Sequence, residues 1–89
     1  MRSYPSVDLH GLFANEAIDR LNQAISEALE AGHERLLVIH GKGTGILRRE
    51  VRDHLKYHPN VVSFQFATVQ EGGEGATVAS LRDRGIDSR

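Results

Sequence analysis

Residues 35–45, RLLVIHGKGTG, restrict the fold more than any other segment, because a run of aliphatic residues leads directly into three glycines at alternate positions. A nearly uninterrupted aliphatic run is typical of a strand that is covered on both faces in a parallel sheet. After the glycines, Leu47, Val51 and Leu55 recur at helical spacing, and the pattern ends before Pro59. The segment therefore predicts a strand, a loop and a helix in direct succession.

The residues before this segment predict a strand and an amphipathic helix. Residues 6–10 form the strand, which ends at Gly11. Five apolar residues then recur at helical spacing: Ala14, Ile18, Leu21, Ile25 and Leu29. We expect Asn15 to cap this helix and Gly32 to follow its end in the left-handed conformation.

Two further strands are predicted in the last third of the chain. Residues 61–69 place Val62, Phe64 and Phe66 at period two, and residues 76–81 return beside them after the turn EGGEG. Aromatic residues in such a strand are more often core than an interaction surface. The order of elements is βαβαββ, so we expect an α/β fold, an α+β sandwich with two helices and a mixed four-stranded sheet.

Length and composition limit the class of protein. A chain of 89 residues forms one small domain with a modest core, and 39% hydrophobic with 26% charged residues is ordinary for a soluble protein. There is no cysteine, no apolar run long enough to span a membrane, and no signal-peptide core at the start. We expect one domain over residues 6–81 with flexible termini at 1–5 and 82–89, a cytoplasmic location and no contact with a membrane.

Charge is distributed unevenly along the chain. The formal net charge of -1 is unusual for a nucleic-acid-binding domain. Residues 11–34 nevertheless carry five acidic side chains and one basic one, whereas residues 40–58 carry five basic and two acidic ones. Either one face of the domain attracts anions, or the pattern is the ordinary scatter of a solvated helix.

The glycine loop is the strongest candidate for a binding site. Gly41, Gly43 and Gly45 allow close approach to the main chain, and the following helix begins with unpaired N–H groups and a partial positive charge, which suit a phosphate. Lys42 adds a mobile charge, and Thr44 adds a hydroxyl either for a ligand or for capping the helix. The loop matches neither the ATP-binding nor the dinucleotide-binding glycine motif, and a turn without a ligand is the alternative.

A second loop is expected beside the first. A right-handed βαβ unit brings the ends of both parallel strands, DLHG and HGKGTG, to one edge of the sheet, where α/β folds bind ligands. Asp8 and His10 leave the same face of their strand and form a recurrent acid–base arrangement. His10 is either a general acid or base or a structural histidine, and His40 either contacts a phosphate or braces the loop.

Metal binding is an alternative for these side chains. Asp8, His10 and His40 in principle offer three ligands to zinc or manganese, although no local spacing indicates such a site. His54 and His58 have the spacing of a helical zinc pair but lie at a helix end without a third ligand, so we expect them to be solvated.

The turn EGGEG is a further candidate. Glu71 and Glu74 either form a carboxylate pair or belong to a turn, and we expect Gly72, Gly73 and Gly75 to line the substrate groove.

Four segments together resemble a known family. The stretches VDLHG, HGKGTGILR, HPNVVSFQFA and EGGEGATVASL are similar, in order and spacing, to the small MutS-related (Smr) domain over about residues 6–81. The sequence of these segments is most similar to the carboxyl-terminal domain of bacterial MutS paralogues of the second type. The resemblance implies a fold like the carboxyl-terminal domain of a bacterial translation initiation factor, and nicking or endonuclease activity on DNA or RNA. Members include DNA-nicking domains and enzymes that cut messenger RNA at collided ribosomes, commonly attached to larger host proteins.

The resemblance also implies roles for individual residues. Asp8 and His10 match the family's catalytic D-x-H pair, residues 41–45 match its phosphate-binding loop, and His40 and Arg48 would flank the scissile phosphate. Many second-type paralogues carry arginine in place of His10, and only histidine can remove a proton near neutral pH, which favours RNA cleavage by acid–base chemistry. Such chemistry requires no cofactor, with a divalent metal ion as the alternative. A binding module for nucleic acid or the ribosome that does not cut is the other function we consider.

Overall fold

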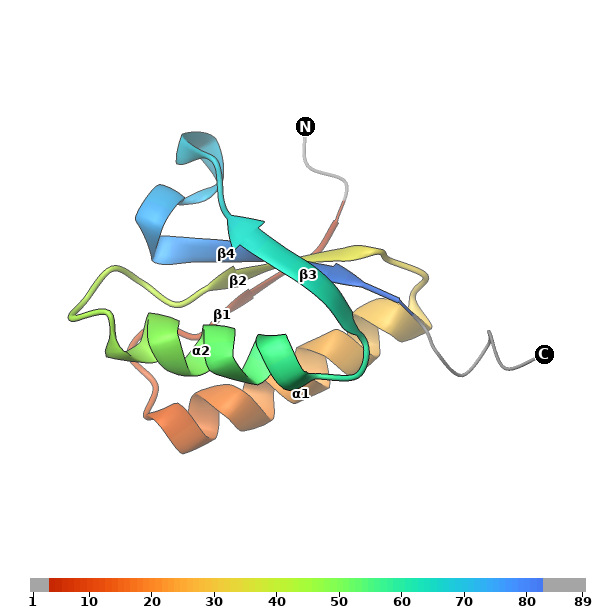
Figure 1. Ribbon diagram of the computed structural model, residues 1–89, viewed down its shortest axis with the longest axis horizontal. Coiled ribbons are helices and arrows are strands. Elements are labelled where there is room, and N and C mark those ends of the chain that lie inside the picture. Colours follow the sequence, from red (N-terminus) through yellow and green to blue (C-terminus); the bar gives the residue numbers. More distant parts are fainter. Residues whose placement is uncertain (1–3, 83–89) are drawn as a thin grey trace.

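A four-stranded sheet carries both helices on one face, and two short turns lie on the other (Figure 1). The computed structural model describes residues 4–82. Its elements in chain order are β1 (Ser6–Asp8), α1 (Ala14–Glu30), β2 (Arg35–Ile39), α2 (Ile46–Tyr57), β3 (Val61–Phe66), the 3-10 turns η1 (Val69–Glu71) and η2 (Gly73–Gly75), and β4 (Ala76–Leu81). The predicted βαβαββ order and two-helix sandwich are confirmed.

The sheet has the strand order β1-β2-β4-β3 and is mixed. β1 and β2 run parallel, with Asp8 opposite Ile39, whereas β4 runs antiparallel to both β2 and β3. The expectation that β2 lies in a parallel sheet therefore holds only on its β1 side. The connection from β3 to β4 contains no crossover helix, so β4 returns antiparallel and inserts between β2 and β3.

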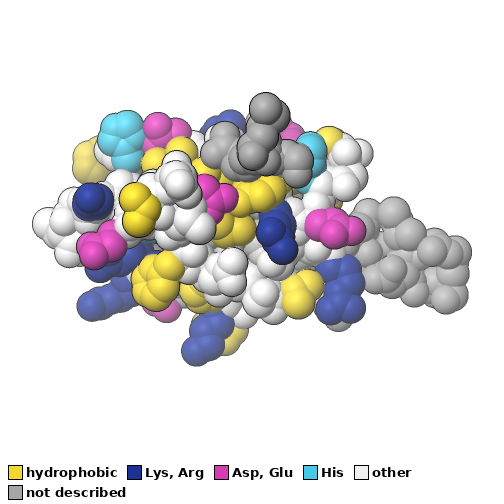
Figure 2. All heavy atoms as spheres, turned by 90° about the horizontal axis from the view of Figure 1, so that it is seen from above, with side chains coloured by type: hydrophobic (Ala, Val, Ile, Leu, Met, Phe, Trp, Pro, Cys, Tyr) yellow, Lys and Arg dark blue, Asp and Glu magenta, His cyan; other side chains and the backbone are white. Residues whose placement is uncertain are grey.

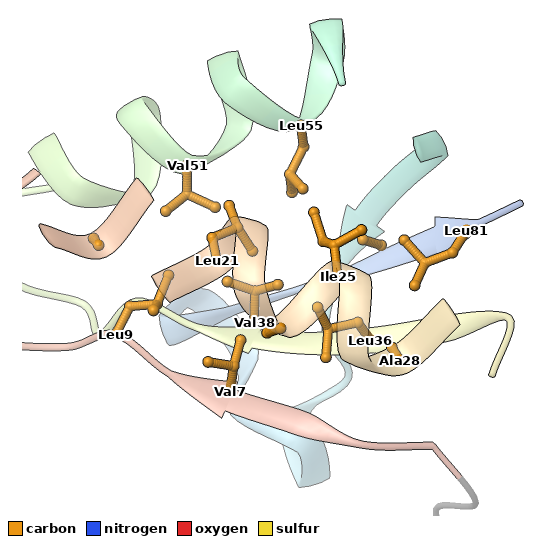
Figure 3. Packing of buried hydrophobic residues seen from close by; sticks show 13 residues of the cluster. Val7, Leu9, Leu21, Ile25, Ala28, Leu36, Val38, Val51, Leu55 and Leu81 are labelled. Atoms are coloured by element: carbon orange, nitrogen blue, oxygen red, sulfur yellow. The ribbon is translucent and has the colours of Figure 1, made fainter. Parts of the chain in front are cut away.

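The main core lies between the helices and the sheet (Figure 3). Alternate strand residues point toward the helices, and the apolar stripes of α1 and α2 close over them. The labelled core residues are Val7, Leu9, Leu21, Ile25, Ala28, Leu36, Val38, Val51, Leu55 and Leu81. Burying one such large side chain stabilises the fold by about 1.5 to 3 kcal/mol, so this layer fixes the strand ends in space.

A smaller cluster covers the opposite face of the sheet. Leu37 and Val78 are buried there, with Tyr4 packed against the cluster. Tyr4 also donates a hydrogen bond to the carboxylate of Glu71, and the Leu37 N–H donates to the carbonyl of Pro5 at 2.9 Å. Residues 4 and 5, expected to be flexible, are thus held in place; residues 1–3 and 83–89 of the expected flexible termini lie outside the described part of the chain.

The start of α1 differs from the prediction. Phe13, not Asn15, is the N-cap residue, and the Ala17 N–H donates to the Phe13 carbonyl at 2.8 Å. Glu16 supplies the polar group, because its carboxylate accepts a hydrogen bond from the Phe13 N–H at 3.2 Å. At the other end, Gly32 follows the helix with φ +83°, so the expected left-handed stop is correct.

The aromatic residues of β3 have different environments. Phe64 packs against the main core, whereas Phe66 is 67% exposed. The Arg52 guanidinium lies 4.1 Å from the Phe66 ring centroid. The expectation of a core residue was therefore wrong for Phe66, because α2 presents a charged side chain instead of an apolar one above it.

Candidate active site

The loops after β1 and β2 meet at one end of the sheet, where Figure 1 shows the glycine loop at the left. The Leu9 N–H donates to the Ile39 carbonyl at 2.7 Å, which extends the parallel pairing to the first loop. A Cβ atom added to Gly41 would lie 3.1 Å from the Cβ of His10. The structure thus places Gly41 against His10, as the topology predicts.

Asp8 and His10 form a hydrogen-bonded pair on the surface. The His10 Nδ1 atom lies 2.7 Å from the Asp8 Oδ1 atom, which also accepts the His10 backbone N–H at 3.1 Å. Their side chains are 55% and 69% exposed, whereas Leu9 between them is fully buried. The buried Leu9 explains why the neighbours on either side both face outward.

The pair has a defined proton arrangement. The hydrogen bonds from the His10 ring and then from its backbone hold the pKa of Asp8 below its usual value, so the carboxylate is ionised and can only accept. The His10 Nδ1 must therefore carry the proton that it shares with Asp8. In the neutral imidazole, the lone pair then lies on Nε2, which is the atom able to accept a proton from a substrate.

The glycine loop and both helix starts surround one hollow. Residues 11–14 form one wall, and residues 40–48 form the other, around a volume of about 370 Å³. The first-turn N–H groups of α2 have no acceptors within their own helix and no acidic residue beside them, so α2 presents positive charge here. At the start of α1, Glu16 offsets this charge. Asp8 and His10 do not line the hollow; they stand beside Gly41, which does.

Two basic side chains have different positions around this hollow. A Cβ atom added to Gly45, which has φ +88°, would lie 3.0 Å from an Arg48 guanidinium nitrogen, so Arg48 folds back over the loop. Lys42 instead lies along Gly75, whose added Cβ would contact the Lys42 Cγ at 3.5 Å. Figure 2 shows several Lys and Arg side chains gathered at the left and lower left, the end at which the loop lies.

Thr44 remains close to the start of α2. Its hydroxyl lies 3.4 Å from the Ile46 N–H, a long contact, and Gly45 is the N-cap residue. The side chain is exposed, so both alternatives considered for it, a contact with a ligand and a weak cap, agree with its position.

His40 has a different environment from the one expected of a catalytic residue. Only 3% of it is exposed, and its Nδ1–H donates to the Gly41 carbonyl at 3.0 Å. Its Nε2 lies 2.9 Å from the Thr77 hydroxyl, which in turn accepts a hydrogen bond from Arg52 Nε at 3.3 Å. Because both ring nitrogens are engaged inside the protein, the structure agrees with the second alternative for His40, bracing of the loop. The prediction that His40 is a catalytic residue in contact with the phosphate is wrong.

A neutral His40 completes the hydrogen-bond chain from Arg52 to Gly41. With Nδ1 donating to a carbonyl, Nε2 must accept the proton of the Thr77 hydroxyl. Burial lowers the pKa of His40, the bond to Gly41 opposes this shift, and the charges of Arg52 and Arg48 lower the pKa further. Burial and the Arg48 charge likewise lower the pKa of Arg52, whose Nη2 is buried without a hydrogen-bond partner among the described residues.

The turn before β4 also supports the glycine loop. The Gly75 carbonyl accepts hydrogen bonds from the N–H groups of His40 and Gly41, at 3.0 and 2.9 Å. Gly75 is buried and therefore serves as a brace, not as the groove wall that we expected. Gly72 and Gly73 shape the turn with φ of +122° and +55°, and neither lines the hollow.

Glu71 and Glu74 do not act as a pair. The Glu71 carboxylate accepts a hydrogen bond from the Thr68 N–H at 3.1 Å in addition to the one from Tyr4, so it holds the turn together. Glu74 is exposed. Of the two alternatives for these carboxylates, the structure agrees with turn chemistry.

His54 and His58 are not simply solvated, as we expected. His54 Nε2 lies 2.6 Å from the side-chain oxygen of Asn22 and so links the two helices, while His58 Nδ1 accepts the Asn60 N–H at 3.1 Å. Burial, followed by the nearby His54, lowers the pKa of His58. Both histidines line a separate hollow between α1 and α2, toward the end of α2 far from the glycine loop.

The metal alternative does not fit the donor set that suggested it. Within residues 4–82, no three His, Cys, Asp or Glu side chains are grouped so that they could share a metal ion. In the set of Asp8, His10 and His40, the last is turned into the interior with both nitrogens engaged. Over the same residues, no helix is both long enough and apolar enough to cross a membrane.

Sequence reasoning missed Thr77 and Arg52 as parts of the site. Thr77 contacts His40 directly, and Arg52 acts through Thr77. A signal was present for Thr77, because it is a polar residue between two apolar ones, Ala76 and Val78, near the start of β4. Nothing in the pattern of α2 distinguished Arg52 from the other basic residues.

Comparison with known proteins gives a consistent result. A family model described as the Smr domain matches residues 7–82. Endonuclease MutS2 of Symbiobacterium thermophilum is 44% identical over 79 residues, which are 89% of this chain but only 10% of that protein. The chain therefore spans about a tenth of the length of the curated relatives that it matches.

Two solved structures have the same fold. The crystal structure of the Smr domain of Thermus thermophilus MutS2 superposes with a TM-score of 0.85 and 44% identity, covering 89% of this chain and 99% of that one. YdaL, a stand-alone small MutS-related protein from Escherichia coli, gives a TM-score of 0.82 and 30% identity, covering 88% of this chain and 64% of that one.

Proposed function

Because the chain belongs to the Smr domain family, we propose that it is a nucleic-acid endonuclease domain that cleaves phosphodiester bonds, with RNA as its preferred substrate. The observation that carries this proposal is the exposed Asp8–His10 pair, which stands directly against Gly41 of the glycine loop. It combines a proton acceptor with an anion-binding loop.

In the proposed reaction, the loop holds one phosphodiester. The N–H groups at the start of α2, together with Arg48 above Gly45, hydrogen-bond its non-bridging oxygens and stabilise the charge that builds up on them. Lys42 adds a cation at the edge of the same loop. The hydrogen bonds that link His40, Thr77 and Arg52 keep the loop in this shape without touching the substrate.

His10 acts as the base. Its Nε2 removes the proton from a ribose 2′-hydroxyl, and the 2′-oxygen attacks the phosphorus while the bond to the 5′-oxygen breaks. The products are a 2′,3′-cyclic phosphate and a strand whose freed 5′-oxygen takes a proton from water, and the His10 imidazolium gives its proton to the hydroxide that is left. Asp8 keeps the ring oriented and stabilises the imidazolium that forms. DNA lacks the attacking hydroxyl, so cleavage of DNA would require His10 to activate a water molecule.

The surroundings of the reaction are part of the same proposal. We place it in the cytoplasm, without a required cofactor, although a divalent ion held jointly with the substrate phosphate remains an alternative. Because the relatives are about ten times longer, we expect a larger host protein or the ribosome to deliver the substrate. The excess of three positive charges over residues 40–58 alone would bind nucleic acid only weakly.

The test incubates the purified chain with three matched substrates: single-stranded RNA, the same RNA with 2′-deoxyribose at the mapped cut site, and supercoiled plasmid. Each reaction is run with and without EDTA. We expect RNA cleavage that survives EDTA, yields a cyclic phosphate and stops at the deoxyribose. Plasmid nicking that is lost with EDTA would instead indicate metal-assisted hydrolysis of DNA. Binding of all three without products would indicate the binding module and contradict the proposal.

A further inference from the structure

Large apolar side chains are exposed at the rim of the hollow that holds the glycine loop. Phe13 is 78% exposed and Ile46 is 67% exposed, with Leu12 beside them at 37%. Phe13 is the N-cap residue of α1, and Ile46 is the first residue of α2, so the two come from opposite walls. An aromatic ring in this position lies outside the core and adds little to the stability of the fold.

Capping does not explain Phe13 either. N-cap residues are usually Ser, Thr, Asp or Asn, because their side-chain oxygen accepts a free helix N–H, and phenylalanine has no such oxygen. Glu16 does part of the capping instead, by accepting the Phe13 N–H. Neither the cap of the helix nor the core therefore accounts for the ring.

The other exposed rings already have partners. Arg52 lies over Phe66, and Lys56 lies 5.6 Å from the ring centroid of Tyr57. Among residues 4–82, neither a cation nor a second aromatic ring stacks on Phe13. Phe13 therefore offers an open aromatic face beside the loop.

The charge of the hollow defines the occupant. Its lining contains Lys42, Arg48 and the start of α2, which has no acidic residue in its first turn, and none of the lining residues is acidic. Glu16 offsets the charge at the start of α1 only. An occupant that is apolar throughout would leave these positive groups without a counter-charge. A nucleotide satisfies both parts of the hollow, because it carries a phosphate at one end and a flat base at the other.

We propose that this hollow binds an unpaired nucleobase, stacked on the ring of Phe13 and packed against Ile46, while the phosphate of the same strand lies in the glycine loop. This inference rests on the proposed nucleic-acid function and specifies it: the substrate is single-stranded at the cut site. A base within a duplex is already stacked on its neighbours and cannot present its face to Phe13. Stacking is tolerant of base identity, because every base has a π face, so this subsite selects strandedness and not sequence.

The experiment measures binding of the full 89-residue chain by fluorescence anisotropy, with His10 replaced by Ala so that no substrate is cut. The probes are a labelled single-stranded RNA, the same strand with abasic positions, and its duplex. On this background, Phe13→Ala should weaken binding of the single strand by about 5- to 150-fold, and Phe13→Trp should restore it. Neither substitution of Phe13 should change binding of the duplex. The parent of this series, His10→Ala with Phe13 intact, should bind the abasic strand as weakly as the Phe13→Ala variant binds the intact strand.

Tyr57→Ala is the matched control, since Tyr57 is also 78% exposed but lies at the other end of α2. It should bind the single strand like the parent. Circular dichroism and thermal melting check that Phe13→Ala leaves the fold intact, as expected for an exposed side chain.

Several results would overturn the inference. These are equal binding of the single strand by Phe13→Ala and the parent, an equal loss for duplex and single strand, and self-association of the chain that Phe13→Ala abolishes. Phe13→Ala could bind the single strand normally while the unmodified chain cleaves RNA and His10→Ala does not. In that case the subsite is wrong but the proposed function stands. If the parent binds no nucleic acid at all, both fail.

Discussion

Replacing Thr77 with Val tests whether the glycine loop is held by the hydrogen-bond chain beneath it. Thr77 is fully buried, and valine has nearly the same shape without the hydroxyl. The change leaves His40 Nε2 without its donor at 2.9 Å and Arg52 Nε without its acceptor at 3.3 Å. An unsatisfied buried polar group costs about 1 to 3 kcal/mol. Arg52 is partly exposed and can turn to water, so we assign the cost mainly to His40 and expect a loss of about 1 to 3 kcal/mol.

Urea denaturation measures this loss as a lower midpoint with an unchanged slope. A domain of this size should melt about 4 to 8 °C lower for each kcal/mol lost. Thr77→Ser is the matched control, because it keeps both hydrogen bonds and removes one methyl group, which costs about 1 kcal/mol. Nucleic-acid binding should fall in Thr77→Val and persist in Thr77→Ser. A valine variant as stable as the parent, or less damaged than the serine variant, would refute the bracing role of His40.

Three further predictions concern the same end of the molecule. Lys42→Ala should weaken binding of single-stranded nucleic acid and flatten its salt dependence by about one phosphate's share, whereas Lys56→Ala, at the far end of α2, should do neither; equal effects would mean that the charge acts only at long range. Because burial keeps the folded-state pKa of His40 below 6.5, the unfolded chain takes up the proton first as the pH falls, so the free energy of unfolding should decrease below about pH 6.5. In urea melts, the free energy of unfolding of His40→Gln should decrease less over this pH range, and an identical pH profile would count against a buried neutral His40. Gly41→Ala and Gly11→Ala place alanine at φ +82° and +83°, with a backbone strain of about 1 to 2 kcal/mol each, but only the Cβ atom at position 41 also approaches the His10 side chain. Gly41→Ala should therefore be less stable and less active than Gly11→Ala, and equal melting temperatures would argue against the contact with His10.

Local pattern was sufficient for most of the fold. The turn EGGEG followed by residues 76–81 predicted β4 with its observed bounds, and Gly32 predicted the end of α1, because both depend on neighbouring residues alone. The position of the α1 cap was wrong, since the polar group that closes the helix start comes from Glu16 and not from a residue ahead of the helix. The sequence pattern indicates capping by a side chain at the helix boundary, and it does not indicate capping by a side chain such as Glu16, which reaches back from within the first turn.

The candidate site was less accessible to sequence reasoning. Topology alone brought the loop of His10 beside that of Gly41, because parallel strands end at one edge. Burial of His40 was not foreseeable in the same way. It depends on Thr77, 37 residues later, and on a β4 that inserts next to β2. Contacts between distant segments decide whether a polar residue faces solvent or the interior, and spacing does not report them.

The proposed reaction depends most on the proton acceptor at His10, and single-turnover cleavage of single-stranded RNA with excess protein measures its contribution directly. His10→Ala is compared with the parent and with His33→Ala, which removes a histidine at the opposite end of β2. Positioned acid–base catalysis contributes about 10²- to 10⁴-fold. We expect the cleavage rate of His10→Ala to fall by that factor with RNA binding and melting temperature unchanged, and His33→Ala to cut at the parent rate. Cleavage by His10→Ala at the parent rate would show that His10 is not the base.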